Sequence, residues 1–233
     1  MKTIGMLGGM SWESTLSYYK AINEGVKQRL GGLHSAKIAL YSVDFADIER
    51  LQHQGDWDAT ARILTDGAKA VEAAGADFLL ICTNTMHKVA PQIAANIQIP
   101  ILHIADATAK QLKADGISRV GLLGTRFTME QDFYKSRLTE LFGIEVLVPD
   151  LAGRELVHRV IYDELCLGKI NPASREAYLG IMESLVSQGA QAIILGCTEI
   201  ALLVRQQDTQ IKLYDTTQIH AQSAVEMALQ TAG

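Results

Sequence analysis

Two short polar runs, far apart in the chain, hold the residues best suited to chemistry. They are Thr83-Asn84-Thr85 and Cys197-Thr198-Glu199, and each directly follows an apolar stretch that predicts a buried strand. A cysteine at the end of such a strand, next to a glycine and before a predicted helix, has backbone amide dipoles nearby that favour its thiolate. The competing interpretation is that Cys197 is a small buried apolar side chain, as most free cysteines are.

An internal repeat relates the two runs. Residues 5–9 resemble residues 121–125, and residues 74–81 resemble residues 188–195, so the chain predicts two homologous halves. The repeat aligns Thr83 with Cys197, and Cys82 with Gly196. Because side chains on a strand alternate between its faces, we expect Thr83 to point the same way as Cys197. Cys82 is then expected to pack in the core, as is Cys166, which lies in a helical pattern.

Short apolar stretches alternate with helical patterns, which favours parallel strands joined by crossover helices. The expected strands are residues 3–7, 37–43, 77–82, 99–103, 120–123, 145–148, 192–196 and 211–214. The expected helices are residues 14–30, 57–74, 105–115, 130–142, 174–188 and 220–231. The predicted fold is α/β, with two similar Rossmann-like parallel-sheet halves related by pseudo-twofold symmetry and the active site in the cleft between them. The first domain is expected to cover residues 1–110 and 216–233, and the second residues 111–215.

A glycine turn opens each half. Gly8 and Gly9 follow the first strand, but the G-x-G-x-x-G spacing of dinucleotide sites is missing. One interpretation is that this turn brings backbone N–H groups and Met10 close to a small ligand; the other is a tight turn that needs glycine only for backbone freedom. In the second half, Thr125 and Thr128 either bind a carboxylate together with the amides of a helix start or only cap that helix.

The composition bounds the class of protein. Of 233 residues, 48% are hydrophobic and 20% are charged, which is ordinary for a globular protein with a sizeable core. A net charge of −5 argues against non-specific nucleic-acid binding. The sequence shows no secretory signal pattern and no apolar run long enough to span a membrane. Three cysteines without a disulfide framework suit a reducing cytosol, and no spacing predicts a metal site. We therefore expect a cytoplasmic protein that binds neither nucleic acid nor membrane.

The chain resembles the aspartate/glutamate racemase family over essentially its whole length. The similar segments are IGMLGGMS, NTMH, HIADAT, GLLGT and LGCTE. The resemblance implies a small amino-acid substrate, no pyridoxal phosphate or other cofactor, and two cysteines that act on opposite faces of the substrate Cα. Inverting a stereocentre through a planar carbanion requires an acid and a base on either side of it. By the same analogy a homodimer is expected, although no sequence pattern marks an interface.

The sequence departs from the family at one of the two cysteines. Thr83 stands where the family has a cysteine before Asn84, whereas the second cysteine is kept as Cys197. The resemblance therefore implies that Cys197 is the base for the L-enantiomer and that Thr83, directly or through water, protonates the other face. Arg50 and Lys169 look like the cations that hold the distal carboxylate, unless each is a solvated surface charge. The α-carboxylate is assigned to polar side chains at the strand ends: Asn84, Thr85 and Thr198.

Two neighbours of these runs have supporting roles in this interpretation. His87 is expected to orient its loop, and Glu199 either to orient Cys197 or to cap a helix. Three other functions stay open. They are a broader-specificity amino-acid racemase, a single-cysteine enzyme of the arylmalonate decarboxylase or maleate isomerase type, and a two-lobed binder that lost its activity with the missing cysteine.

Overall fold

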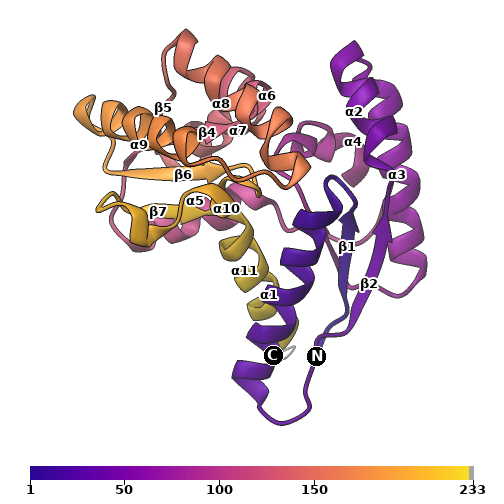
Figure 1. The fold of residues 1–233 in the computed structure, drawn as a ribbon. Helices are drawn as coiled ribbons and strands as arrows, with labels where there is room; N and C mark the ends of the chain where they lie inside the picture. Colours follow the sequence, from indigo (N-terminus) through magenta and orange to yellow (C-terminus); the bar gives the residue numbers. More distant parts are fainter. Residues whose placement is uncertain (231–233) are drawn as a thin grey trace. The chain divides into compact units, whose positions relative to one another are not determined.

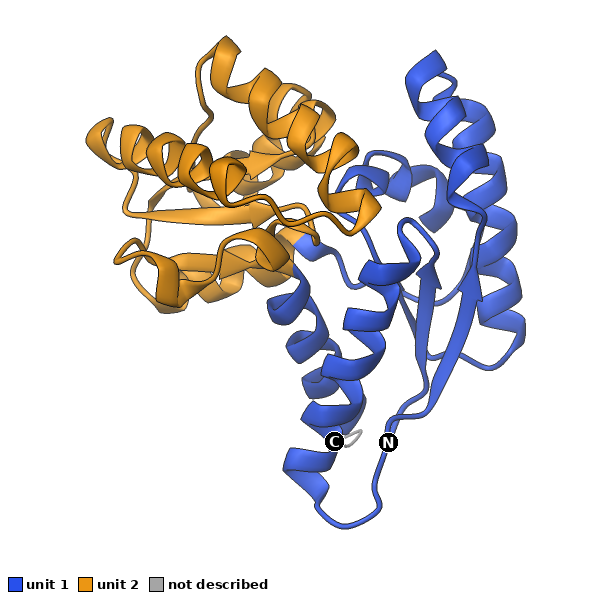
Figure 2. Ribbon diagram, in the orientation of Figure 1, with its two compact units in different colours: residues 1–104, 217–233 blue, residues 105–216 orange. Residues whose placement is uncertain are grey.

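The computed structural model describes residues 1–230, which form two compact units (Figure 2). The first comprises Met1–Ile104 together with the chain from Thr217 onward, and the second comprises Ala105–Thr216. Each unit contains one parallel sheet with helices packed on it, in agreement with the predicted α/β class. None of the helices within residues 1–230 combines the length and the hydropathy of a membrane-spanning segment.

The sheet of the first unit has three parallel strands in the order β2-β1-β3. They are β1 (Ile4–Gly8), β2 (Ile38–Ser42) and β3 (Phe78–Ile81). The register pairs Leu7 of β1 with Ile81 of β3, so these two strands end next to each other. Because parallel strands bring their carboxyl ends to one edge of a sheet, the turn after Gly8 and the run after Ile81 are neighbours.

Helices cover both faces of this sheet, and the alternating strand side chains feed two separate cores. On one face α1 (Trp12–Leu30) and α11 (Thr216–Leu229) lie side by side (Figure 1) and pack against Met6, Leu80 and Cys82. The other face packs against α2, α3, η1 and α4 through residues such as Leu7 and Leu79. These elements are α2 (Phe45–Gln54), α3 (Trp57–Ala73), η1 (Thr85–Val89) and α4 (Ala90–Ala94).

The second unit has a four-stranded parallel sheet in the order β5-β4-β6-β7. Its strands are β4 (Arg119–Gly124), β5 (Glu145–Leu147), β6 (Ala192–Gly196) and β7 (Leu213–Asp215). Its longer helices are α5 (Ile104–Ala114), α8 (Leu151–Asp163) and α9 (Pro172–Ser187). Its shorter elements are α6 (Arg126–Glu130), α7 (Asp132–Ser136), η2 (Arg137–Leu141), η3 (Leu165–Leu167), α10 (Ile200–Leu203) and η4 (Gln206–Asp208). The core holds side chains of β6, α8 and α9.

The structure differs from the predicted elements at several places. Residues 99–103 form no strand; one bridge joins Ile101 to Leu79, because Pro100 has no N–H to donate and α5 begins at Ile104. The helix expected over residues 130–142 is instead α7 followed by a π-helical turn, η2. α2 lies where no helix was expected, and α8 overlaps only at its end with the helical pattern around Ile161 and Cys166. The end of the last predicted helix, Thr231, lies outside the described residues.

A buried histidine joins α11 to the rest of the first unit. The Nε2–H of His220 donates to the carbonyl oxygen of Leu102 at 2.7 Å, so its Nδ1 accepts the hydroxyl of Tyr18 at 2.8 Å. Because a carbonyl oxygen can only accept, these two bonds define a neutral imidazole. Burial, and after it the nearby His87, lower the pKa of His220 from 6.5 to about 3.

This histidine predicts a loss of stability in acid. Above pH 6.5 His220 is neutral in both the folded and the unfolded chain. Below that pH only the unfolded chain takes up its proton, until the folded pKa of about 3 is reached. The free energy of unfolding should therefore fall by about 1.4 kcal/mol per pH unit over this range from His220 alone. Denaturant unfolding at several pH values should show a slope one proton smaller in His220→Gln. The exposed His34→Gln is the control, and equal slopes in all three proteins would contradict the assignment.

Candidate functional site

The glycine turn of the first unit is built by its own backbone and hydroxyl contacts. Gly9 has a φ of +90°, and a side-chain carbon there would stand 2.2 Å from the carbonyl oxygen of Val43, so glycine is required. The N–H of Gly9 donates to Thr15 Oγ1 at 2.8 Å, and Ser11 caps α1 by accepting from the N–H of Ser14. Met10 is 4% exposed and packs in the core with Leu7 and other apolar side chains. The turn is thus rigid whether or not it touches a ligand.

The predicted polar run Thr83-Asn84-Thr85 follows β3, whose carboxyl end lies next to that of β1. Thr83 is half-buried, while Asn84 and Thr85 are buried. The carbonyl oxygen of Thr83 accepts the Nδ1–H of His87 at 2.8 Å. Cys82 is completely buried among apolar side chains between the sheet and α1, and burial raises the pKa of its thiol. Cys82 therefore belongs to the core, as the alternation of strand side chains predicted.

The two predicted cations lie on exposed positions of the separate units. Arg50 is in α2, where its guanidinium pairs with Asp47 at 2.8 Å and its side chain is 59% exposed. Lys169 lies two residues after the end of η3; its side chain is exposed and its backbone N–H donates to the carbonyl oxygen of Glu164. A surface ion pair of this kind contributes little to stability. Both side chains are long enough to turn toward an anion, and their role in binding stays a prediction.

Cys197 of the second unit is held against a carboxylate. Its thiol, at a residue 9% exposed, donates to Glu199 Oε2 at 3.0 Å. The hydroxyl of Thr198 donates to the same oxygen at 2.6 Å. Burial is the largest cause that raises the pKa of the Cys197 thiol well above its usual value, and the charge of Glu199 is the second. In this state Cys197 carries its proton at neutral pH and has a proton acceptor at hydrogen-bond distance.

The second glycine turn lies beside this cysteine. β4 and β6 pair to their last residues, Gly124 and Gly196, so that Thr125 and Cys197 follow at the same edge of the sheet. A side-chain carbon on Gly124 would stand 2.9 Å from the carbonyl oxygen of Gly196, so the two strand ends approach closely only with glycine there. Thr125 Oγ1 accepts the N–H of Thr128 and lies 3.3 Å from Thr128 Oγ1. The Thr125 hydroxyl therefore caps α6, which is one of the two roles that the sequence left open.

The electrostatic surroundings of Cys197 include two residues to which sequence patterns gave no role at the site. Tyr178 of α9 is buried and donates its hydroxyl to the carbonyl oxygen of Val157 at 2.9 Å. The pKa of Tyr178 is raised by burial first and then by the negative charge that Cys197 would carry. Cys166, in η3, is partly buried against the same core and also raises the pKa of Cys197. Only the fold brings α9, η3 and β6 together, so no local pattern could have found them.

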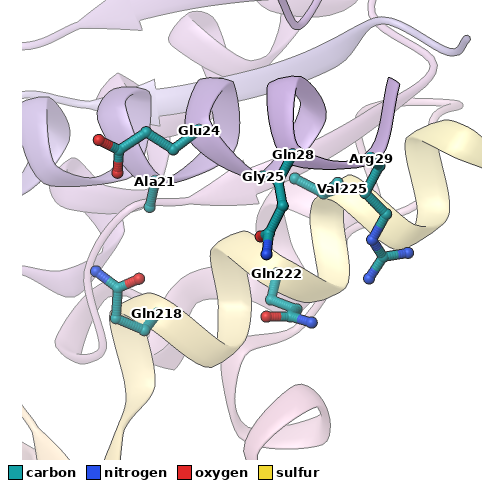
Figure 3. A pocket seen from close by; sticks show the side chains of 8 residues that line it. All are labelled: Ala21, Glu24, Gly25, Gln28, Arg29, Gln218, Gln222 and Val225. Carbon is teal, nitrogen blue, oxygen red and sulfur yellow. The ribbon is translucent and has the colours of Figure 1, made fainter. Parts of the chain in front are cut away.

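One hollow on the surface of the first unit is lined by other residues. It is a groove of about 200 Å³ between α1 and α11 (Figure 3). Its walls are mostly exposed polar side chains, among them Glu24, Gln28, Arg29, Gln218 and Gln222. None of the predicted site residues lines it. The strand-end residues are therefore the candidate site on chemical grounds.

Comparison with known proteins decides the family. The family model described as Asp/Glu/Hydantoin racemase matches residues 7–224. The chain belongs to this family. Among curated proteins it is 23% identical to the broad specificity amino-acid racemase RacX of Bacillus subtilis, over 97% of this chain and 98% of that protein. Relatives of this kind are named amino-acid racemases, and amino-acid racemases are isomerases.

Solved structures support the same membership. A candidate Asp/Glu racemase from Yersinia pestis is 58% identical, with a TM-score of 0.92 over 99% of this chain and 100% of that one. An aspartate racemase homologue from Pyrococcus horikoshii is 34% identical, with a TM-score of 0.86 over the same shares of the two chains. The racemase family thus accounts for the two-unit α/β fold of this chain.

The contact between Cys197 and Glu199 predicts how reactive the thiol is. Glu199→Gln removes a negative charge at nearly constant size. Because that charge and its hydrogen bond both raise the pKa of Cys197, the pKa should fall and alkylation by iodoacetamide at a fixed, mildly alkaline pH should become faster. Peptide mapping follows Cys197, with the fully buried Cys82 as an internal control for opening of the fold. Unchanged or slower alkylation of Cys197 would show that Glu199 does not control the thiol.

Proposed function

We propose that this protein racemises acidic amino acids without a cofactor, by removing the α-proton and returning one to the opposite face. The observation that carries the proposal is the buried Cys197 thiol with Glu199 as its proton acceptor at 3.0 Å, in a chain of the racemase family. A proton transfer at Cα needs a group whose proton can leave and return inside a site shielded from water, and a thiol–carboxylate pair meets that need.

The proton movements follow from this pair. Cys197 rests as a thiol, so it acts as a base only after its proton has moved to Glu199. The resulting thiolate takes the α-proton of the L-enantiomer and leaves a planar carbanion. In the reverse direction the thiol of Cys197 delivers a proton to that carbanion on the same face. While the proton moves from the thiol to Glu199 the charge of the pair does not change, because the carboxylate takes up the proton that the sulfur gives up. When the thiolate then takes the α-proton, the negative charge passes to the carbanion.

Thr83 serves the opposite face in this proposal. A hydroxyl is a far weaker base than a thiolate at neutral pH, so Thr83 passes a proton from water to the carbanion instead of holding a negative charge. The half-buried position of Thr83 is compatible with such a water. Since the two enantiomers have equal free energies, kcat/KM must be the same in both directions. The difference between Cys197 and Thr83 can therefore alter the rate of α-proton exchange and the substrate concentration at which each direction saturates. It cannot alter the final ratio of the two enantiomers.

The remaining predicted residues bind the substrate in this proposal. Arg50 and Lys169 hold the distal carboxylate, which favours aspartate and glutamate over neutral amino acids. The α-carboxylate and its surroundings are contacted by residues of the two strand edges: Met10, Asn84, Thr85, Thr125, Thr128 and Thr198. A cytoplasmic location and a homodimer remain predictions from composition and from the family resemblance.

The test is α-proton exchange in heavy water. Wild-type protein is incubated with L-aspartate or L-glutamate, NMR follows loss of the α-proton, and chiral chromatography follows inversion. We expect exchange accompanied by inversion, and a loss of at least about 100-fold in both with Cys197→Ser, the typical contribution of a positioned acid or base. Thr83→Ala should keep exchange and lose inversion.

Other results of this experiment would support a different role for Thr83 or one of the alternative functions. Full inversion by Thr83→Ala would remove Thr83 from the mechanism. No exchange with either amino acid, but carbon dioxide from malonates or conversion of maleate, would identify a single-thiol enzyme of the other types. Stabilisation by aspartate or glutamate without any exchange would indicate a binder.

A further inference from the structure

His87 makes two hydrogen bonds that tie the end of β3 to Ile104, where the first segment of the first unit ends. Its Nδ1 lies 2.8 Å from the carbonyl oxygen of Thr83, and its Nε2 lies 3.2 Å from the backbone N–H of Ile104. A carbonyl oxygen accepts and an N–H donates, so Nδ1 carries the proton and Nε2 has none. His87 is therefore a neutral imidazole in one defined tautomer.

The surroundings favour this neutral form. His87 is 2% exposed, and its ring centre lies 4.4 Å from that of His103 and 6.0 Å from that of His220. His103 is 9% exposed and His220 is fully buried. A proton on Nε2 of His87 would face the N–H of Ile104 and lose the hydrogen bond, in addition to the cost of burying a charge. The imidazole of His87 thus packs against His103 and the neutral His220, and its orientation is fixed by its two hydrogen bonds.

The bond to Thr83 acts on the backbone at the proposed proton donor. Holding its carbonyl oxygen fixes the peptide plane between Thr83 and Asn84, and with it the direction in which the side chain of Thr83 leaves the end of β3. The N–H of His87 also donates to the carbonyl oxygen of Asn84 at 3.1 Å, so the imidazole and the backbone of η1 brace the same turn. A hydroxyl that passes protons has no charge to draw it to its partner, so its placement depends on such a brace.

We propose that His87 is the positioning residue for Thr83: its Nδ1–H holds the Thr83 carbonyl so that the hydroxyl is aimed for proton delivery, while Nε2 anchors the imidazole on Ile104. The inference rests on the proposed racemase function. Loss of the bond to Thr83 should leave exchange by Cys197 intact and lower the number of inversions per exchange. Misplacement of a reacting group by a fraction of an ångström suffices for roughly a tenfold effect.

Two substitutions separate the two hydrogen bonds. The amide nitrogen of His87→Asn lies near the position of Nδ1 and keeps the donor to Thr83, but it does not reach Ile104. The longer His87→Gln places its amide oxygen near the position of Nε2 and keeps the acceptor for Ile104, but it gives up the bond to Thr83. His87→Ala removes both. His53→Ala is the matched control, because His53 makes the same kind of Nδ1 bond to a carbonyl oxygen four residues earlier, that of Glu49, on an exposed helix.

The measurement is inversion per exchange from L-aspartate or L-glutamate in heavy water, combined with hydrogen exchange of the Ile104 amide. We expect His87→Asn and His53→Ala to keep the wild-type ratio, and His87→Gln and His87→Ala to lower it roughly tenfold. The Ile104 amide should lose protection in His87→Asn and His87→Ala but not in His87→Gln. If His87→Ala does not fold, the comparison of His87→Asn with His87→Gln still decides.

Three results would overturn the inference while leaving the racemase function in place. Exchange and inversion that fall in parallel in His87→Gln would mean a general structural role. A ratio that His87→Gln leaves unchanged would mean that the bond to Thr83 has no effect on proton delivery. Nitrogen-15 NMR that assigns the proton of His87 to Nε2 would contradict the geometry itself. If the wild-type protein shows no exchange at all, the racemase function fails and this role with it, whereas an active wild type with an unchanged ratio overturns only the role of His87.

Discussion

The contact between a buried thiol and a buried carboxylate determines what the second unit can do. Cys197 and Glu199 are both almost excluded from solvent, so a proton that leaves the sulfur has a neighbouring acceptor and little access to bulk water. The raised pKa of Cys197 makes the protonated thiol the resting state. A reaction that removes a proton from one carbon and then returns one matches a group of this kind, because the thiol and the carboxylate can each hold a proton beside the reacting carbon.

The parallel sheet of each unit positions a polar run at the edge where its strands end. In each unit the central strands end in register, at Leu7 beside Ile81 and at Gly124 beside Gly196, and the polar run follows at that edge. The two sheet edges carry different groups, held by different contacts. The second has the thiol–carboxylate pair, whereas the first has a hydroxyl, that of Thr83, on a backbone braced by a neutral histidine. In the proposed mechanism, accurate placement of the Thr83 hydroxyl takes the place of the acidity that a thiol would supply at the first edge.

The sequence predicted the strands that carry the site better than the elements around them. β1, β3, β4 and β6 were found to within a residue or two, because each is a short buried apolar stretch bounded by glycine or polar residues. The helix α2 was missed, and with it the ion pair of Arg50, because it is a short polar helix between two loops. Residues 99–103 were expected to form a strand but make only one bridge, because whether two segments pair depends on the tertiary fold and not on the local sequence alone.

The residues of the candidate site also divide into those that a local pattern predicted and those that only the fold brings together. Cys197 and its neighbours could be selected from one local run, and Glu199 follows two residues later. The acceptor role of His87 could not be found in this way, because Ile104 is seventeen residues away in the chain and only the fold brings its N–H to Nε2. Likewise, only packing across elements brings Cys166 of η3 close enough to raise the pKa of Cys197, and brings Tyr178 of α9 close enough for the charge of Cys197 to raise the pKa of Tyr178. Contacts within four residues are accessible to sequence reasoning, and those across elements are not.

The central claim, that one carbon is inverted in both directions, is tested most directly by starting from each enantiomer in turn. Circular dichroism follows wild-type protein with pure L-aspartate and with pure D-aspartate, and then with the two glutamates, until the signal is constant. Racemisation predicts that both reactions of the preferred acid end at equal amounts of the two enantiomers, with equal kcat/KM from either side. A D-enantiomer that stays unchanged while the L-enantiomer is consumed, or a product other than the mirror image, would contradict it.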